Sequence, residues 1–250
     1  MKGKIKLIAF LCSLITFCSF LAAWSDTAPV FGGGVKRKLP VYAVGRDDKK
    51  IAITFDCAWG VEHTDEILEN VEKFGVKCTF FAVQFWVEKY PEYVGKLAEK
   101  GVEIGTHSAT HSHMKALSCD EDERELVSSS QAIEKITGKK VTLFRAPFGE
   151  YDDKLIATAE KLGLQTVQWD VDSLDWKDLG ATEIATRIIG RVKSGSIILC
   201  HNNGKHTAEA LPLVFADLIS RGYEFVTVSE LLLSGETTID ESGVQRRIQQ

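Results

Sequence analysis

The chain has 250 residues, of which 44% are hydrophobic and 26% are charged, a composition typical of a soluble globular protein with a substantial core. This length allows one barrel-sized domain or two small domains. The formal net charge is −5, and because residues 1–25 contribute three lysines and no acidic residue, the remainder carries −8. Binding to a phosphate backbone needs clustered lysine and arginine, so we expect no nucleic acid partner.

The first 25 residues have the pattern of an export signal. Three lysines precede an uncharged stretch, residues 7–23. This order is typical of a secretory signal peptide, and the stretch is at the lower limit of roughly 17 residues for a membrane-spanning helix. We expect residues 1–25 to be a signal peptide or an N-terminal membrane anchor. The protein is then exported, secreted or membrane-anchored with its domain outside the cytoplasm, and it contacts the membrane only through residues 7–23 if they are retained.

The rest of the chain alternates between strand-like and helix-like segments. Residues 26–49 contain a glycine triplet and two prolines, which predicts a linker leading to an edge element near residues 39–44. Further on, apolar runs bounded by turn signals read as strands, and several helical segments end at a glycine. Strands are predicted at 51–55, 77–83, 102–106, 140–144, 165–170, 196–200 and 223–228, and helices at 64–74, 91–100, 120–137, 152–162, 181–193 and 207–221.

This alternation predicts a parallel sheet, because strand-then-helix units with short links cross over in one direction. Seven strands over about 185 residues fit an incomplete barrel better than an open dinucleotide sheet, and the sequence has no Gly-x-Gly-x-x-Gly loop. We expect an α/β fold, a distorted or incomplete (β/α) barrel of about seven parallel strands in a single domain, residues 50–233. The polar tail, residues 234–250, is expected to be poorly ordered.

Polar residues follow four of the predicted strands at the point where each strand ends. Asp56, His107 with His111, Arg145 and His201 occupy these positions. The carboxyl ends of parallel strands converge on one face of a barrel, where catalysis takes place. A carboxylate, a pair of histidines, an arginine and a further histidine on that face predict a metal-assisted hydrolytic site.

Five motifs in this order resemble the polysaccharide deacetylases of the NodB-homology type, carbohydrate esterase family 4. The resemblance covers residues 50–233. With a signal segment, a short domain and a first motif that lacks the usual second aspartate, the chain looks most similar to the sporulation-associated, PdaB-like branch. The motifs are Thr54-Phe55-Asp56, His107-Ser-Ala-Thr-His111, Arg145-Ala-Pro-Phe-Gly149, Asp172-Ser-Leu-Asp175-Trp176 and Leu199-Cys-His201.

The resemblance implies a role for each matched residue. His107 and His111 bind a divalent metal, which we expect to be zinc, with cobalt, manganese or nickel as alternatives, and Asp56 is the general base. Arg145 keeps Asp56 ionised and oriented. His201 is the general acid, which Asp175 keeps protonated. The residues expected to bind substrate are Pro147, Phe148, Trp176 and Leu199. Among them, Phe148 is expected to stabilise the oxyanion through its backbone N–H.

The first motif departs from the family pattern at Cys57, where a second, metal-binding aspartate is usual. A thiolate is a good zinc ligand, so Cys57 is a candidate third ligand. The alternative is an inert thiol that points into the barrel. The sequence leaves both interpretations open.

The sequence therefore predicts a metal-dependent hydrolase that removes N-acetyl groups from cell-wall polysaccharide, either peptidoglycan or a chitin-like polymer, with a role in sporulation. Its expected partner is the N-acetylated glycan, and no protein partner is inferred. The alternative, motivated by Cys57, is a glycan-binding or spore-wall assembly protein of the same fold with an impaired metal site. A carboxylate-pair glycosidase is disfavoured, because the sequence offers no second catalytic acid near Asp56.

Overall fold

The computed structural model describes residues 37–248, of which residues 38–248 belong to one α/β unit. The predicted signal segment, residues 1–25, and most of the predicted linker lie outside the described residues. Within the described part of the chain, no helix combines the length and apolar character needed to cross a membrane.

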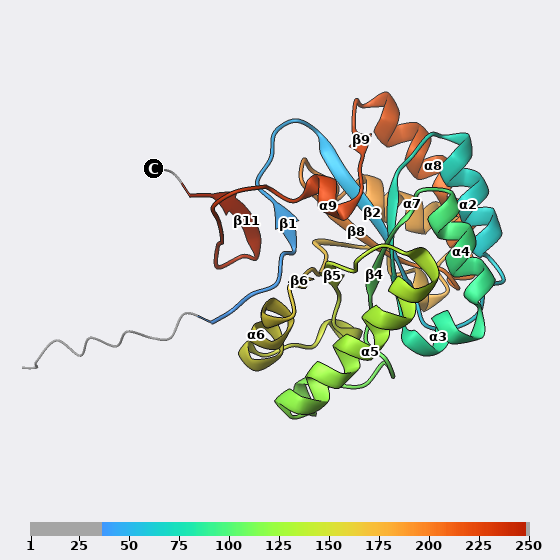
Figure 1. Cartoon of the computed structure of the whole chain (residues 1–250). Helices are drawn as coiled ribbons and strands as arrows, with labels where there is room; N and C mark the ends of the chain where they lie inside the picture. Colours follow the sequence, from blue (N-terminus) through green and yellow to red (C-terminus); the bar gives the residue numbers. More distant parts are fainter. Residues whose placement is uncertain (1–36, 249–250) are drawn as a thin grey trace, which may run out of the picture. The chain divides into compact units, whose positions relative to one another are not determined.

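A curled sheet of seven parallel strands forms the centre of this unit (Figure 1), as the sequence predicts. Two further strand residues, β9 (Glu224–Phe225), pair with the start of β2. The strands lie in the order β6 (Gln165–Thr166), β5 (Leu143–Phe144), β4 (Glu103–Thr106), β3 (Cys78–Ala82), β2 (Lys50–Cys57), β8 (Ile197–His201) and β7 (Val171–Asp172).

The sheet must curl because its two edge strands are neighbours in sequence. A flat sheet of seven strands would separate its edges by about 29 Å at 4.8 Å per strand. The chain from Thr166 to Val171 spans at most about 18 Å, yet β6 and β7 lie at opposite ends of the strand order. The predicted continuous strand at 165–170 is therefore wrong: the chain leaves β6, crosses the open side of the barrel, and enters β7.

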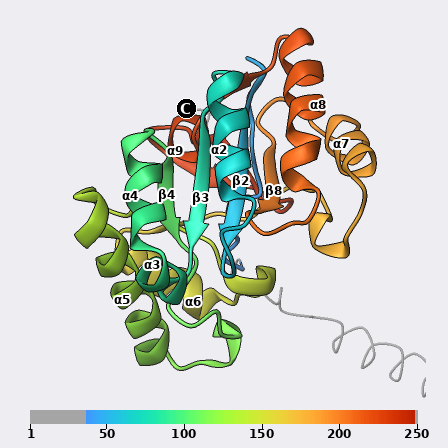
Figure 2. The same ribbon diagram turned by 90° about the vertical axis from the view of Figure 1, so that its right-hand side faces the viewer.

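Helices cover the outer face of the sheet, and Figure 2 shows α2, α4 and α8 alongside the central strands. Among the described residues, the longest helix begins at the capping box of Ser118 and Glu121 and ends at Gly138, whose φ of 65° suits glycine. The helices are α2 (Thr64–Lys73), α3 (Gln84–Lys89), α4 (Pro91–Glu99), α5 (Cys119–Thr137), α6 (Asp153–Lys161), α7 (Ala181–Ile189), α8 (Thr207–Ser220) and α9 (Val228–Leu231).

Strand alternation divides the core into two layers. On β2, Phe55 and Cys57 face outward and belong to the large cluster between sheet and helices. Ala52 faces inward and packs with Phe81 and Ile197 in a smaller cluster within the curl. Because successive side chains point to opposite faces, Thr54 and Asp56 face inward with Ala52.

The C-terminal segment is more ordered than the sequence indicates. β10 (Thr237–Ile239) and β11 (Val244–Arg247) form a hairpin, and β11 pairs in parallel with β1 (Ala43–Val44). The turn is closed by Asp240, whose carboxylate accepts hydrogen bonds from the N–H groups of Ser242 and Val244. Over residues 237–247 the expectation of a poorly ordered tail is wrong, because a local turn joins two strands and β11 pairs with a strand some 200 residues away.

Candidate active site

Four of the predicted site residues meet at the carboxyl end of the sheet. Asp56 lies near the end of β2 and His201 ends β8, while His107 and Arg145 directly follow β4 and β5. Asp56 and His201 are register partners in the parallel pair β2–β8, so their side chains lie side by side on the inner face. The structure thus places these residues at a single site.

A buried ion pair between Asp56 and Arg145 forms the floor of the site. Arg145 Nη1 lies 2.7 Å from Asp56 Oδ1, and Arg145 is fully buried. The guanidinium also donates to Thr54 Oγ1 at 2.8 Å and to the Gln168 carbonyl at 3.1 Å, and it lies 4.1 Å from the ring centroid of Phe81. These contacts fix Arg145 and, through it, the orientation of Asp56.

The Asp56 carboxyl group is held in its ionised form. Burial by itself raises the pKa of Asp56, but the charge of Arg145, the nearby His201 and the Arg145 hydrogen bond lower it overall. Arg145 binds only Oδ1. Oδ2 faces His107, with 3.6 Å between it and His107 Nε2, so one carboxylate oxygen remains available to accept a proton.

His107 and His111 present neutral imidazoles next to this oxygen. His107 Nδ1 lies 2.8 Å from the Arg145 carbonyl oxygen; a carbonyl only accepts, so Nδ1 carries the proton and Nε2 keeps its lone pair. Burial lowers the pKa of His107, and burial is the largest cause that lowers the pKa of His111 to about 4. The two ring centroids are 5.0 Å apart. Neutral imidazole is the form that binds metal ions.

Aromatic rings hold His111 on two sides. Trp59 lies 4.9 Å and Phe148 lies 4.6 Å from the His111 ring, measured between centroids. Phe148 in turn stacks on His113 at 4.3 Å, and its φ of 60° places a non-glycine residue in the left-handed region. Such a conformation costs on the order of 1–3 kcal/mol and persists at functional sites where surrounding contacts enforce it.

His201 is paired with a buried carboxylate, as the sequence predicts. Its Nδ1 and its backbone N–H each lie 2.7 Å from an oxygen of Asp175, and Thr207 Oγ1 donates to the same carboxylate at 2.7 Å. Burial by itself lowers the pKa of His201, but the hydrogen bond and charge of Asp175 raise it overall. His201 is therefore suited to donate a proton.

The predicted substrate-binding residues are close in sequence to the residues of this site. Leu199 is buried on β8 two positions before His201, on the same face. Pro147 is buried at the start of the turn that carries Phe148. Trp176 follows Asp175 and is 57% exposed. That they bind the acetyl group stays a prediction.

Cys57 occupies a different environment from the site residues. Its side chain is fully buried in the core cluster between sheet and helices, and burial raises the pKa of its thiol far above its usual range. The side chain follows Asp56 on the strand and so faces the opposite side of β2. The structure supports the inert buried thiol and not the thiolate ligand.

The donor set fits a divalent cation held by two nitrogens. His107 Nε2 and the His111 imidazole are neutral, adjacent and suited to zinc, while the third ligand that the sequence suggested is turned away. Within residues 37–248, the structure contains no group of three or more His, Cys, Asp or Glu side chains that could hold a metal ion. Catalytic zinc sites usually have three protein ligands, so we expect weaker binding here.

The family model for polysaccharide deacetylase matches residues 43–167, half of the chain. The chain belongs to the polysaccharide deacetylase family. Over 196 residues it is 34% identical to a peptidoglycan-N-acetylglucosamine deacetylase of Bacillus cereus, covering 76% of this chain and 92% of that protein. It is also 34% identical to the peptidoglycan-N-acetylmuramic acid deacetylase PdaC of Bacillus subtilis, with 75% of this chain but only 40% of that protein covered.

A solved structure of a family pseudoenzyme is also similar. The chain superposes on a CE4 family pseudoenzyme from Bacillus anthracis with a TM-score of 0.75 and 33% identity, covering 77% of this chain and 68% of that one. Membership of the deacetylase family confirms the resemblance found in the sequence. The sporulation-associated branch stays a prediction.

Two residues that support the site were not predicted from the sequence. Thr54 supports Arg145, and strand alternation from Asp56 could have placed it on the inner face. Thr207 binds Asp175 from a helix 32 residues further on, and no local pattern marks it.

We predict that Arg145→Met destabilises the protein by about 3–5 kcal/mol at pH 7, because it leaves the Asp56 charge buried without a partner. The pKa of Asp56 is lowered in the folded state, so its contribution to stability is present above its unfolded pKa and is lost as pH falls through the folded pKa. Urea unfolding at several pH values measures this, with the exposed Arg124→Met as control. Adding Asp56→Asn should recover part of the loss; no recovery would contradict the buried-charge explanation.

Proposed function

We propose that this protein is a metal-dependent hydrolase that removes N-acetyl groups from the glycan strands of peptidoglycan outside the cytoplasm, with a role in sporulation. The observation that carries the proposal is the pairing of an ionised carboxylate with a protonatable imidazole on adjacent strands, Asp56 with His201. The family membership, the names of the relatives and the export pattern of residues 1–25 support the substrate and the location.

Hydrolysis of an N-acetyl group requires activation of both water and leaving group, because an amide resists neutral water. A divalent cation held by His107 and His111 would supply Lewis acidity, which polarises the acetyl carbonyl and makes water more acidic. Asp56 takes the proton of the attacking water on Oδ2, the oxygen that Arg145 leaves free. Its neighbouring charges keep this carboxylate ionised and ready to act.

The other half of the reaction belongs to His201. An amine leaves readily only when it is protonated, and His201, whose pKa is raised by Asp175, holds a proton to give. The backbone N–H of Phe148 is placed in this scheme to stabilise the oxyanion, an effect worth about 3–4 kcal/mol in comparable sites. In this scheme the acetyl methyl group lies in a pocket formed by Pro147, Trp176 and Leu199.

Acetate release is the direct test. With added zinc, the purified chain should release acetate from an N-acetylglucosamine oligomer or from peptidoglycan, and a chelator or His107→Ala should abolish the release. His206→Ala is the matched control, because His206 pairs with Glu209 on α8 and takes no part in the proposed chemistry. Absence of acetate release with zinc, cobalt and manganese alike would overturn the proposal.

We predict that Asp175→Asn shifts the alkaline limb of the activity profile to lower pH. Asp175 raises the pKa of His201, and the general acid works only below that pKa, so activity is lost at a lower pH once the carboxylate is removed. Asp178→Asn, an exposed carboxylate three residues away, is the control. An unshifted alkaline limb in Asp175→Asn would assign the proton donation to another group.

The position of Cys57 favours one second candidate, a glycan-binding protein with little catalysis. Its thiol lies in the core, which leaves two imidazoles as protein ligands, and a similar structure is described as a CE4 family pseudoenzyme. In this case the chain should bind peptidoglycan without releasing acetate, and Asp56→Asn should bind as well as the wild type. If the wild type releases acetate and Asp56→Asn abolishes this release, the protein is a hydrolase and the second candidate is excluded.

A further inference from the structure

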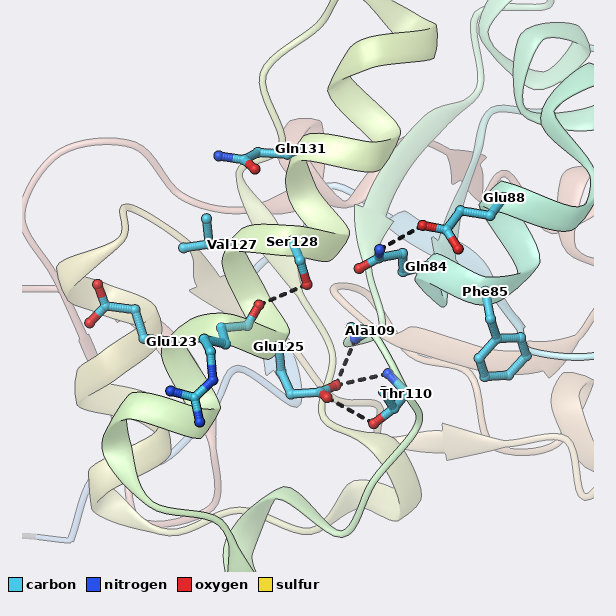
Figure 3. A pocket seen from close by; sticks show the side chains of 11 residues that line it. Gln84, Phe85, Glu88, Ala109, Thr110, Glu123, Glu125, Val127, Ser128 and Gln131 are labelled. Atoms are coloured by element: carbon cyan, nitrogen blue, oxygen red, sulfur yellow. Dashed lines mark hydrogen bonds between the residues drawn. The ribbon is translucent and has the colours of Figure 1, made fainter.

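The segment between the two histidines is held by a carboxylate from another element. Glu125 on α5 accepts three hydrogen bonds of 2.8 Å: from the N–H groups of Ala109 and Thr110 to Oε2, and from Thr110 Oγ1 to Oε1 (Figure 3). Both carboxylate oxygens are therefore used on two consecutive residues. Charge-assisted hydrogen bonds of this kind are roughly twice as strong as neutral ones.

This segment needs such support because its backbone is strained. Ser108 has a φ of 72° and His111 a φ of 56°, and each non-glycine residue in this region costs on the order of 1–3 kcal/mol. Two left-handed residues within four positions turn the chain so that His111 lies back beside His107, with 5.0 Å between ring centroids. Contacts from outside the turn, together with the hydrogen bond from the His111 N–H to Ser108 Oγ at 3.0 Å, offset this cost.

Two helices contact the turn at consecutive residues. The N–H of Gln84, at the start of α3, donates to the Ser108 carbonyl at 3.1 Å, and Glu125 holds the next two residues. Figure 3 shows Glu125 reaching from α5 toward Ala109 and Thr110, beside the open groove between α5 and α3. Thr110 itself is exposed, so core packing does not replace the Glu125 contacts there.

Within residues 37–248, the hydrogen bonds that the Glu125 carboxylate accepts from other segments all come from this turn. Among the described residues, Glu125 forms no ion pair with a lysine or arginine, whereas Glu123, two residues earlier on the same helix, pairs with Lys161 at 3.1 Å. Removing the Glu125 carboxylate therefore removes support for the turn and breaks no inter-helix salt bridge. Glu123 is a matched control at a neighbouring position.

We propose that Glu125 is a positioning residue for the metal site: it holds the 108–111 turn so that the His111 imidazole stays beside His107 and both can bind one cation. The proposal rests on the metal-binding role given to these histidines under the proposed function. It adds a residue outside the five motifs, which acts through the backbone and touches neither substrate nor cation.

The test compares Glu125→Gln and Glu125→Ala with Glu123→Gln in the full chain. Zinc affinity is measured by competition with a chromogenic chelator, and thermal unfolding is recorded in parallel. Loss of groups that orient metal ligands typically weakens metal affinity by about 10–100-fold, and we expect this range for both Glu125 variants. Thr110→Val, which loses one of the three bonds, should lie between them and the wild type. Glu123→Gln should leave the affinity unchanged.

A second readout needs neither metal nor activity. In the metal-free protein, the imidazole proton signals of His111 in the NMR spectrum, assigned with His111→Ala, should move or broaden in Glu125→Gln, while those of His201 stay in place. Unchanged His111 signals together with unchanged zinc affinity would overturn the inference, even if the variant melts at a lower temperature. A wild type that binds zinc but releases no acetate would instead count against the proposed function alone.

Discussion

The buried ion pair between Asp56 and Arg145 is the interaction on which the rest of the site depends. It joins β2 to the end of β5, and it fixes one carboxylate oxygen while leaving the other beside His107. The Arg145 carbonyl also accepts a hydrogen bond from His107 Nδ1–H, so a single residue orients both the proposed base and one of the imidazoles proposed to bind metal. A buried charge without its partner is strongly destabilising, which ties the geometry of the site to the stability of the fold.

Two ionised carboxylates, Asp56 and Asp175, set the protonation of the site. Asp56 sits near cationic groups and stays ionised, while Asp175 stabilises the protonated form of His201. At the same pH, Asp56 is therefore unprotonated and His201 favours its protonated form, although the two are register partners on adjacent strands. His111 lies beside His107, with burial lowering its pKa, and Glu125 on α5 binds the two residues that precede it.

Much of this arrangement could be predicted because it is local in sequence. An apolar run that ends in a polar residue marks both a strand and its functional end, which locates Asp56, His107, Arg145 and His201. Long-range closure is not local: the separation of β6 from β7 and the pairing of β11 with β1 depend on the completed sheet. Glu125 reads as a surface charge in the sequence until the turn it holds is seen.

The most direct test of the central claim is anomalous diffraction from crystals of the full chain soaked with zinc. The account predicts one zinc ion bound by His107 Nε2 and by the His111 imidazole, with the Asp56–Arg145 pair intact and the Cys57 thiol buried away from the metal. Zinc bound by Cys57, or found only at sites remote from His107 and His111, would contradict it.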